Sequence, residues 1–315
     1  MQCIVPVTNL IDLAQPGRDR SVKFTSPGVE ENKMNSILRM QLAGAIVAVV
    51  LGSNVLAQST AVTGTFDANR ISYVAQSRSP FVLHLYDNFN QAFLDPSKWL
   101  GISQCGAAME CVREIENGQL HLRVRSYGAN SSNSGTQFSN SSVSLSADSV
   151  NTIKANVTVK NSSPTDCPSN MEVAHSQVLV QGSFFNGGGG TAADDVTAFL
   201  QLDRYAAFEP GTVEVGGFLL YQGQFFDNVD LGPVTMGETV IVSLQWDKSN
   251  HRFVVELDRP KYKTKAVQYM PYSISDTTPP LALYRTLGAN VYPTNCMGSS
   301  VPADLDVSFD NVYTN

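Results

Sequence analysis

The sequence has few of the residues on which binding of nucleic acids or metals usually depends. Lys and Arg together number 21 against 28 Asp and Glu, so the formal net charge is −7. An excess of negative charge gives no electrostatic reason to bind nucleic acid or anionic lipid. Only four histidines are present, and their spacing contains no HExxH pair. We therefore expect no nucleic-acid partner and no motif-defined metal centre.

Long hydrophobic runs are also scarce. The most apolar stretch is the ten residues from Leu42 to Leu51, well short of the roughly 20 that a helix needs to span a bilayer. It follows the basic Arg39 and precedes Ala57, which is the pattern of a secretory signal peptide cut after that alanine. A buried helix or a membrane anchor is the alternative interpretation.

This pattern divides the chain into four parts. The signal peptide is predicted over residues 34–57, and residues 1–33 are interpreted as an over-extended start or a disordered segment. Residues 58–79 form an N-terminal extension, and 80–315 form the folded domain. We expect the mature chain to be secreted, either outside the cell or into a periplasm, and to have no membrane span.

Cysteine is scarce but even in number after the signal peptide. Cys3 lies in the removed segment, which leaves Cys105, Cys111, Cys167 and Cys296. In an exported protein this predicts two disulfides. The short loop favours pairing Cys105 with Cys111, which leaves Cys167 to pair with Cys296. A metal site is the alternative, but no CxxC spacing is present and no histidine lies beside any of the four.

Charged residues make up only 16% of the chain, with 23 Gly and 15 Pro, a composition typical of globular β proteins. Period-2 alternation recurs from about residue 80. In residues 119–125, Leu120, Leu122 and Val124 share one face, and the face opposite carries His121, Arg123 and Arg125. One face is therefore predicted to be core and the other wet.

A hairpin is predicted over residues 240–257, with turn residues at 247–250. Trp246 continues the apolar face of its strand, so we expect a core residue rather than a sugar platform. Further strands are predicted at 143–148, 152–160, 173–184, 195–204, 212–222, 281–287 and 304–314. This many strands in one unit predict an all-β fold of two packed antiparallel sheets, a β-sandwich or jelly roll.

Several short motifs, taken in order, resemble the concanavalin A-like lectin/glucanase superfamily. They are Tyr86–Phe89 with Leu94–Trp99, Glu116–Leu120, Leu244–His251 and Phe309–Tyr313. They look most like its uncharacterised secreted bacterial members, and the resemblance covers roughly residues 80–315. It implies a jelly roll of two curved sheets whose concave face, in many relatives, holds a carbohydrate.

The catalytic motif of the superfamily's glucanases, Glu-x-Asp-x-(x)-Glu, is not found. Its period-2 spacing would bring two carboxylates to one face of a strand as nucleophile and acid/base. The acidic runs at 110–116, 256–258 and 304–310 do not supply the full pattern. A GxSxG elbow is missing as well. No catalytic residue is predicted, and a non-catalytic function is favoured while enzymatic activity stays open.

The strand at 195–205 presents the most suitable surface for a sugar. If its apolar residues face the core, the opposite face combines aromatic rings with hydrogen-bonding groups, as sugars require. The predicted carbohydrate-binding residues are Phe199, Gln201, Asp203 and Tyr205, joined by Arg123 and Arg125 if their strand lies in the same sheet. A guanidinium there would favour an acidic sugar. Alternatively, all are ordinary solvent-facing residues of an antiparallel sheet.

The segment Asp87–Trp99 is predicted to start the sandwich, with Phe89, Phe93, Leu94 and Trp99 pinning the chain's entry. The resemblance also implies a structural calcium ion near the first and last strands, where Asp87 and Asp310 lie at matching motif positions. No dense acidic loop supports it, and both carboxylates have the alternative role of satisfying turn amides. No other cofactor is expected.

These observations predict a secreted, non-catalytic carbohydrate-recognition module whose partner is a glycan or polysaccharide. The alternatives are a polysaccharide-degrading enzyme, hydrolase or lyase, with a non-standard acid/base set, and a structural surface protein that binds no glycan.

Overall fold

The computed structural model describes residues 82–105, 109–127, 139–145, 149–164, 174–206, 208–293 and 301–315. The predicted start, signal peptide and extension lie outside these residues, as does the predicted Cys167–Cys296 disulfide. Within the described part, no helix is both long and apolar enough to cross a membrane.

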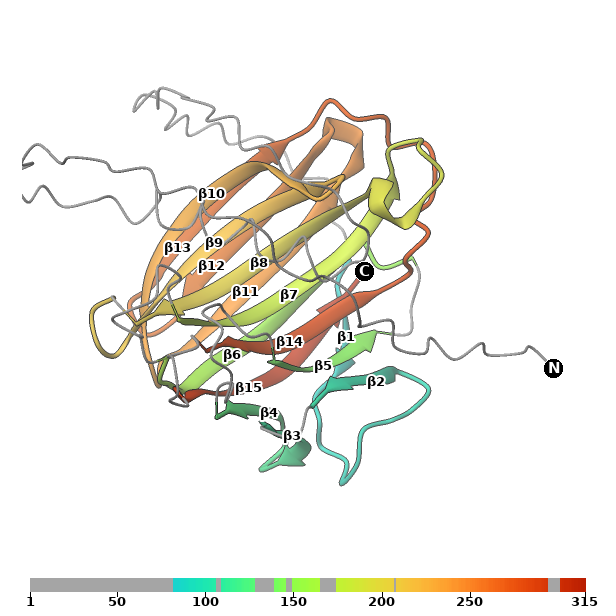
Figure 1. Ribbon diagram of the computed structural model, residues 1–315. Coiled ribbons are helices and arrows are strands. Elements are labelled where there is room, and N and C mark those ends of the chain that lie inside the picture. The colour runs from blue at the N-terminus through green and yellow to red at the C-terminus, as the bar shows by residue number, and fades with distance from the viewer. Residues whose placement is uncertain are drawn as a thin grey trace, which may run out of the picture.

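Two antiparallel sheets make up the fold, as predicted (Figure 1). Sheet A has the order β13-β12-β11-β6-β15-β4-β3, with β1 paired to β15. Its strands are β1 (His84–Asp87), β3 (Met109–Glu116), β4 (Gln119–Ser126), β6 (Thr152–Ser162), β11 (Thr239–Asp247), β12 (Arg252–Arg259), β13 (Thr264–Pro271) and β15 (Ala303–Thr314).

Sheet B has the order β10-β9-β8-β7-β14-β5-β2. Its strands are β2 (Trp99–Gln104), β5 (Ser139–Leu145), β7 (His175–Asn186), β8 (Asp195–Tyr205), β9 (Thr212–Tyr221), β10 (Gln224–Thr235) and β14 (Arg285–Tyr292). The chain passes between the sheets many times, and its first described strand pairs with its last. This connectivity is that of a jelly roll.

The core lies between the sheets and follows the alternation seen in the sequence. Leu120, Leu122 and Val124 on β4 are fully buried. Trp246 on β11 is 8% exposed and belongs to the same core cluster, which confirms it as a core residue. Its indole Nε1–H donates to the Tyr272 hydroxyl at 2.7 Å, so the polar atom of this ring is satisfied inside the fold.

The segment that begins the sandwich is organised by a buried carboxylate. Asp87 accepts hydrogen bonds from the Phe89 backbone N–H at 2.8 Å and from the Trp99 indole at 2.7 Å. Phe89 and Trp99 are buried as predicted. Phe93 is 83% exposed, so the prediction that it pins the segment is wrong; its side chain faces solvent from a bend between β1 and β2.

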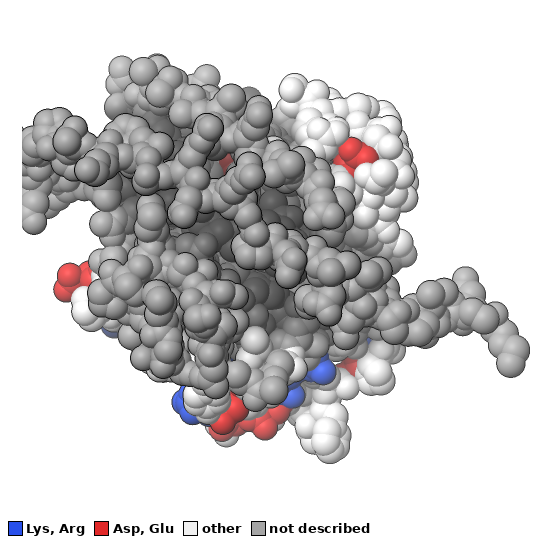
Figure 2. Space-filling view, in the orientation of Figure 1, with Lys and Arg blue, Asp and Glu red and all other residues white. Residues whose placement is uncertain are grey.

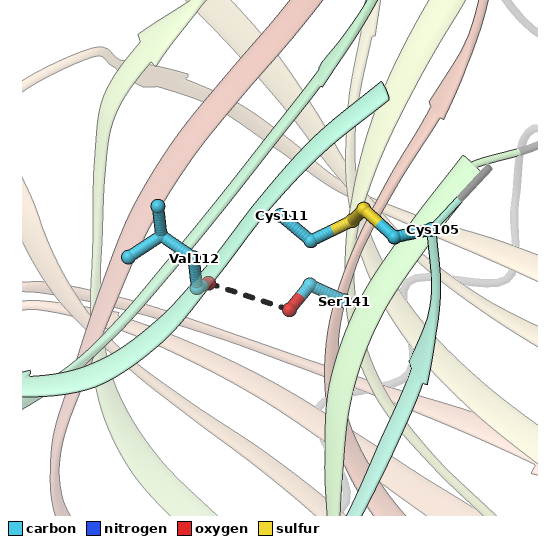
Figure 3. Close-up of a disulfide and its surroundings, with 4 residues drawn as sticks. All are labelled: Cys105, Cys111, Val112 and Ser141. Carbon is cyan, nitrogen blue, oxygen red and sulfur yellow. Dashed lines mark hydrogen bonds between the residues drawn. A yellow bond between two sulfur atoms is a disulfide. The ribbon is translucent and has the colours of Figure 1, made fainter. Parts of the chain in front are cut away.

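One disulfide joins the two sheets at their shared edge. Cys105 follows β2 of sheet B, and Cys111 lies in β3 of sheet A, which confirms the predicted pairing (Figure 3). Beside it, the Ser141 hydroxyl donates to the Val112 carbonyl at 3.3 Å. Covalent and hydrogen-bonded contacts therefore hold β2, β3 and β5 together.

Candidate functional site

The outer face of sheet B, turned away from sheet A, carries the predicted sugar-binding strand β8. Val196, Ala198, Leu200 and Leu202 belong to the core between the sheets, so the alternating residues lie on the outer face. The expected face is therefore confirmed. Every residue of β8 is nevertheless buried, on both faces, which the sequence did not predict.

Phe199 packs in a small apolar cluster on this outer face. The cluster also contains Leu179 on β7 and Phe218 and Leu220 on β9, with Phe225 of β10 packed against it. Phe199 is only 4% exposed. Contrary to the prediction, it is therefore not an open platform on which a sugar could stack. The physical reason is that apolar side chains from both neighbouring strands close around the ring.

Tyr205 forms one end of a stack of three rings. Its ring lies 5.0 Å from that of His175, which lies 4.1 Å from the ring of Tyr292 on β14. Phe208, in the loop after β8, packs on Tyr205 at 4.9 Å. Tyr205 is 3% exposed, so it too is not an open platform. Burial raises the pKa of both tyrosines, and both phenols stay protonated.

Asp203, near the C-terminal end of β8, is 1% exposed. In the strand register it is opposite Gln177 on β7 and Glu214 on β9. Burial raises the pKa of Asp203 from 3.8 to about 8, against a smaller lowering by the hydrogen bond from Gln177. The carboxyl is therefore mainly protonated at neutral pH, when it both donates and accepts hydrogen bonds.

Two buried oxygen atoms on the outer face, one on Asp203 and one on Gln177, have unused hydrogen-bonding capacity. Within the part of the chain that the structure describes, Asp203 Oδ1 and Gln177 Oε1 have no hydrogen-bond partner. Gln177 is 3% exposed, and Asn290 on β14 lies opposite it in the register. Buried polar atoms without partners cost free energy, so these oxygens mark a place where a bound molecule would be stabilised by supplying donors.

Two further acidic residues, Glu214 and Asp230, lie between Asp203 and the β10 edge of sheet B. Glu214 is half-buried, and its pKa is raised by burial and then by the charge of Asp230 on β10. Asp230 is exposed. We call Asp203, Glu214 and Asp230 the acidic row. The outer face thus grades from buried at β8 to open at β10. Two carboxyl groups lie directly opposite each other at Asp203 and Glu214, and ionisation of both would destabilise the sheet.

Gln201 is the predicted site residue between the apolar cluster and the acidic row. It is 4% exposed and lies opposite Leu179 and Gly216. The structure therefore brings Gln201 and Asp203 together with two residues that the sequence analysis missed, Gln177 and Glu214. Period-2 alternation in the predicted strand at 173–184 could have placed Gln177 on the outer face. It could not have shown that Gln177 lies opposite Asp203.

Arg123 and Arg125 are not part of this site, because β4 lies in sheet A. The Arg125 Nε donates to Asp304 Oδ2 at 2.9 Å, and its Nη1 lies 3.5 Å from Glu110 Oε2. The hydrogen bond that Arg125 donates to Asp304 is the main cause of the raised Arg125 pKa. Figure 2 shows basic and acidic side chains gathered together at the rim where β3 and β4 lie. The condition under which both arginines would join this site and favour an acidic sugar is therefore not met.

Asp87 and Asp310, the predicted calcium ligands, accept hydrogen bonds from protein groups. Those of Asp87 are described above, and Asp310 accepts from the Asn311 backbone N–H at 2.7 Å and from its side-chain amide at 2.9 Å. Both carboxylates thus satisfy N–H groups of the protein itself, which is close to the alternative role. Among the described residues, no group of three or more His, Cys, Asp or Glu is placed to hold a metal ion. Calcium binding stays a prediction.

No family model and no curated protein matches the chain. Solved structures with a similar course of strands include lectin II from Ulex europaeus, at 13% identity and a TM-score of 0.32, covering 74% of this chain and 99% of the lectin. Lectin I-B4 from Griffonia simplicifolia has 13% identity and a TM-score of 0.30, covering 73% of this chain and 98% of the lectin.

A third similar structure is a 1,3-α-1,4-β-D-galactose-4-sulfate-3,6-anhydro-D-galactose 4 galactohydrolase. It has 9% identity and a TM-score of 0.42, and the match covers 77% of this chain and 97% of the other. Identities and TM-scores this low assign neither a ligand nor a reaction, because one fold serves many functions.

Proposed function

We propose that the chain is a carbohydrate-recognition module, acting outside the cell or in a periplasm, that binds a glycan on the outer face of sheet B. The observation that carries this proposal is the pair of buried oxygens, Asp203 Oδ1 and Gln177 Oε1, without partners among the described residues. Neighbouring strands lie about 4.8 Å apart, so these oxygens would meet adjacent hydroxyl groups of one sugar ring.

A sugar suits this site because its hydroxyls both donate and accept hydrogen bonds. Asp203 with its raised pKa has both capacities at neutral pH, and the amide of Asn290 extends the row on β14. Open access at β10, where Asp230 is exposed, gives an extended glycan a route to the buried residues.

Binding to a glycan array, followed by calorimetry with the best ligand, tests the proposal. We expect selective binding that Gln177→Ala weakens by about 10-fold, since one charge-neutral hydrogen bond in a buried site contributes roughly 0.5–1.5 kcal/mol and a stranded partner costs more. Arg125→Ala, on the other sheet, is the matched control and should bind normally. Failure of every glycan to bind would refute the proposal and favour a structural surface protein.

A second candidate function, polysaccharide cleavage, is favoured by the Asp203–Glu214 pair. Residues directly opposite in an antiparallel pair have Cβ atoms about 4.5–5.5 Å apart, close to the roughly 5–5.5 Å between the carboxyls of retaining glycosidases. Asp203 would be the general acid, because its pKa is the more strongly raised, and Glu214 the nucleophile. Release of reducing ends from a polysaccharide panel, lost in Glu214→Gln, would show cleavage; no release leaves recognition alone.

A further inference from the structure

The charges on the outer face of sheet B narrow the class of glycan. Three carboxyl groups lie there on successive strands: Asp203, Glu214 and Asp230. Among the described residues of this sheet, the two arginines of the strands, Arg204 and Arg285, alternate with outer-face residues and so lie toward the core side. No described lysine or arginine therefore faces the acidic row from its own sheet.

The groups that face Asp203 are neutral or acidic. Gln177 and Glu214 are its cross-strand neighbours, and Tyr205 and Tyr292 are close enough for its charge to raise the pKa of each phenol. His175 lies between the two tyrosine rings. Negative charge in this row thus has no described Lys or Arg beside it, unlike Asp304 and Glu256 on sheet A.

We infer that the site takes a glycan carrying protonated amino groups, with the ammonium group of an amino sugar seated between Asp203 and Glu214 and a following sugar near Asp230. This inference rests on the proposed function and deepens it. An ammonium group supplies the positive charge that lets Asp203 ionise opposite Glu214, and it donates hydrogen bonds to the unused oxygens of Asp203 and Gln177.

An organic cation fits better than a metal ion. The described residues contain no group of three or more potential ligands that converge on one point, and the acidic row extends over three strands instead. Carboxyl groups spread over three strands suit a glycan that carries a positive charge on successive sugars. A cation beside a carboxyl also lowers its pKa, so an amino sugar that binds would displace the proton that Asp203 holds in the free protein.

Calorimetry with three probes matched in chain length tests the inference: oligomers of glucosamine, of N-acetylglucosamine and of glucose. At about pH 6, below the range in which amino groups lose their proton, we expect the glucosamine oligomer to bind about 10-fold or more tightly than the other two. Its binding enthalpy should vary with the ionisation enthalpy of the buffer, which reports release of up to about one proton. The neutral oligomers should release none.

Variants separate the site from general attraction between a polycation and an acidic protein. Glu214→Gln should remove most of the preference for glucosamine, and Asp203→Asn should also abolish proton release. Glu256→Gln, an equal change of charge on β12 of sheet A, is the matched control and should change neither. Circular dichroism checks that each variant folds, and the half-buried Glu214 provides the test if Asp203→Asn does not fold.

The outcomes also distinguish this inference from the proposed function. If glucose or N-acetylglucosamine oligomers bind as tightly as glucosamine oligomers, glycan recognition stands and the preference for amino sugars is wrong. If oligolysine of equal charge binds as tightly with the same proton release, the acidic row is no sugar site. If no oligomer binds in this test and none binds on a glycan array, both proposals fail.

Discussion

The outer faces of the two sheets hold charge in opposite ways. On sheet A, acidic groups are paired with cations: Lys265 Nζ lies 2.8 Å from Glu256 Oε2, and Arg125 Nε lies 2.9 Å from Asp304 Oδ2. On sheet B, Asp203 and Glu214 face each other across the strands. Paired, half-exposed charges on a sheet cost little and contribute little. Two opposed carboxyls would destabilise the fold if both were ionised, and burial keeps Asp203 mainly protonated instead.

This difference helps to distinguish charged residues that only stabilise the fold from those that bind a ligand. The pairs on sheet A are complete without any partner molecule, so a structural role accounts for them. Asp203 has a perturbed pKa and an oxygen without a partner among the described residues, two features typical of binding and catalytic groups. The candidate site is therefore marked by buried oxygen atoms without hydrogen-bond partners among the described residues, rather than by exposed aromatic rings.

The largest expected effect is that of Asp203→Asn on the pH dependence of the free energy of unfolding. Because the pKa of Asp203 is raised from 3.8 to about 8, the folded state holds a proton that the unfolded state releases as pH increases. The free energy of unfolding should therefore fall between about pH 4 and pH 8, by something on the order of 5 kcal/mol, and level off above that range. Asp203→Asn cannot ionise and should lack most of this decline.

Urea unfolding at a series of pH values measures this effect. Glu214 remains in the Asp203→Asn variant, and its own raised pKa should leave a small residual decline. Glu256→Gln, on sheet A, should follow the wild-type profile. Parallel profiles for the wild type and Asp203→Asn would mean that Asp203 is ionised and compensated in the folded protein, and the contrast between the two sheets would disappear.

A smaller loss is expected from the apolar packing that both sheets share. Trp99 is 4% exposed and contacts Phe89 at 5.5 Å between ring centroids, so Trp99→Ala should lower the free energy of unfolding by about 3–5 kcal/mol. Phe93→Ala, six residues earlier and 83% exposed, is the matched control and should change it by less than about 0.5 kcal/mol. Equal effects in denaturant unfolding would contradict the assigned burial.

The comparison also shows what sequence patterns could and could not predict. Alternation placed β4, β8, β11 and β12 and assigned the correct face to each. It did not find β10, whose register shifts after Phe225 and after Asp230, because two irregularities interrupt the period. It also missed β13, an edge strand of sheet A whose residues are mostly exposed, because such a strand needs no apolar alternation.

The site was only half predictable for a related reason. Period 2 assigns a residue to a face, but it says nothing about which strand lies beside it. The alternation therefore placed Arg123 on the correct face of its strand but left open which sheet the strand belongs to, and the structure puts it in sheet A. Gln177 and Glu214 lie beside Asp203 only through the order β7-β8-β9, and the burial of Phe199 depends on Phe218 from a neighbouring strand.

An intermediate effect is expected from the disulfide that joins the two sheets. Cys105 and Cys111 are six positions apart, and closing so short a loop restricts the unfolded chain by about 2 kcal/mol. Replacing both cysteines with serine should lower the free energy of unfolding by about this amount and leave glycan binding unchanged, since β2 and β10 are the opposite edges of sheet B and β3 lies in the other sheet. An equal midpoint in urea for wild type and variant would show that the link adds no stability.

The smallest effect is expected from removing a paired charge on sheet A. Lys265 is 44% exposed and Glu256 is 17% exposed at the side chain, so solvent screens their attraction and Glu256→Gln should cost less than about 1 kcal/mol in the free energy of unfolding. Raising the salt concentration should shrink even this difference, because the pair lies near the surface. A loss as large as that for Trp99→Ala would mean that paired charges on sheet A carry stability, and the distinction drawn between the two faces would then rest on Asp203 alone.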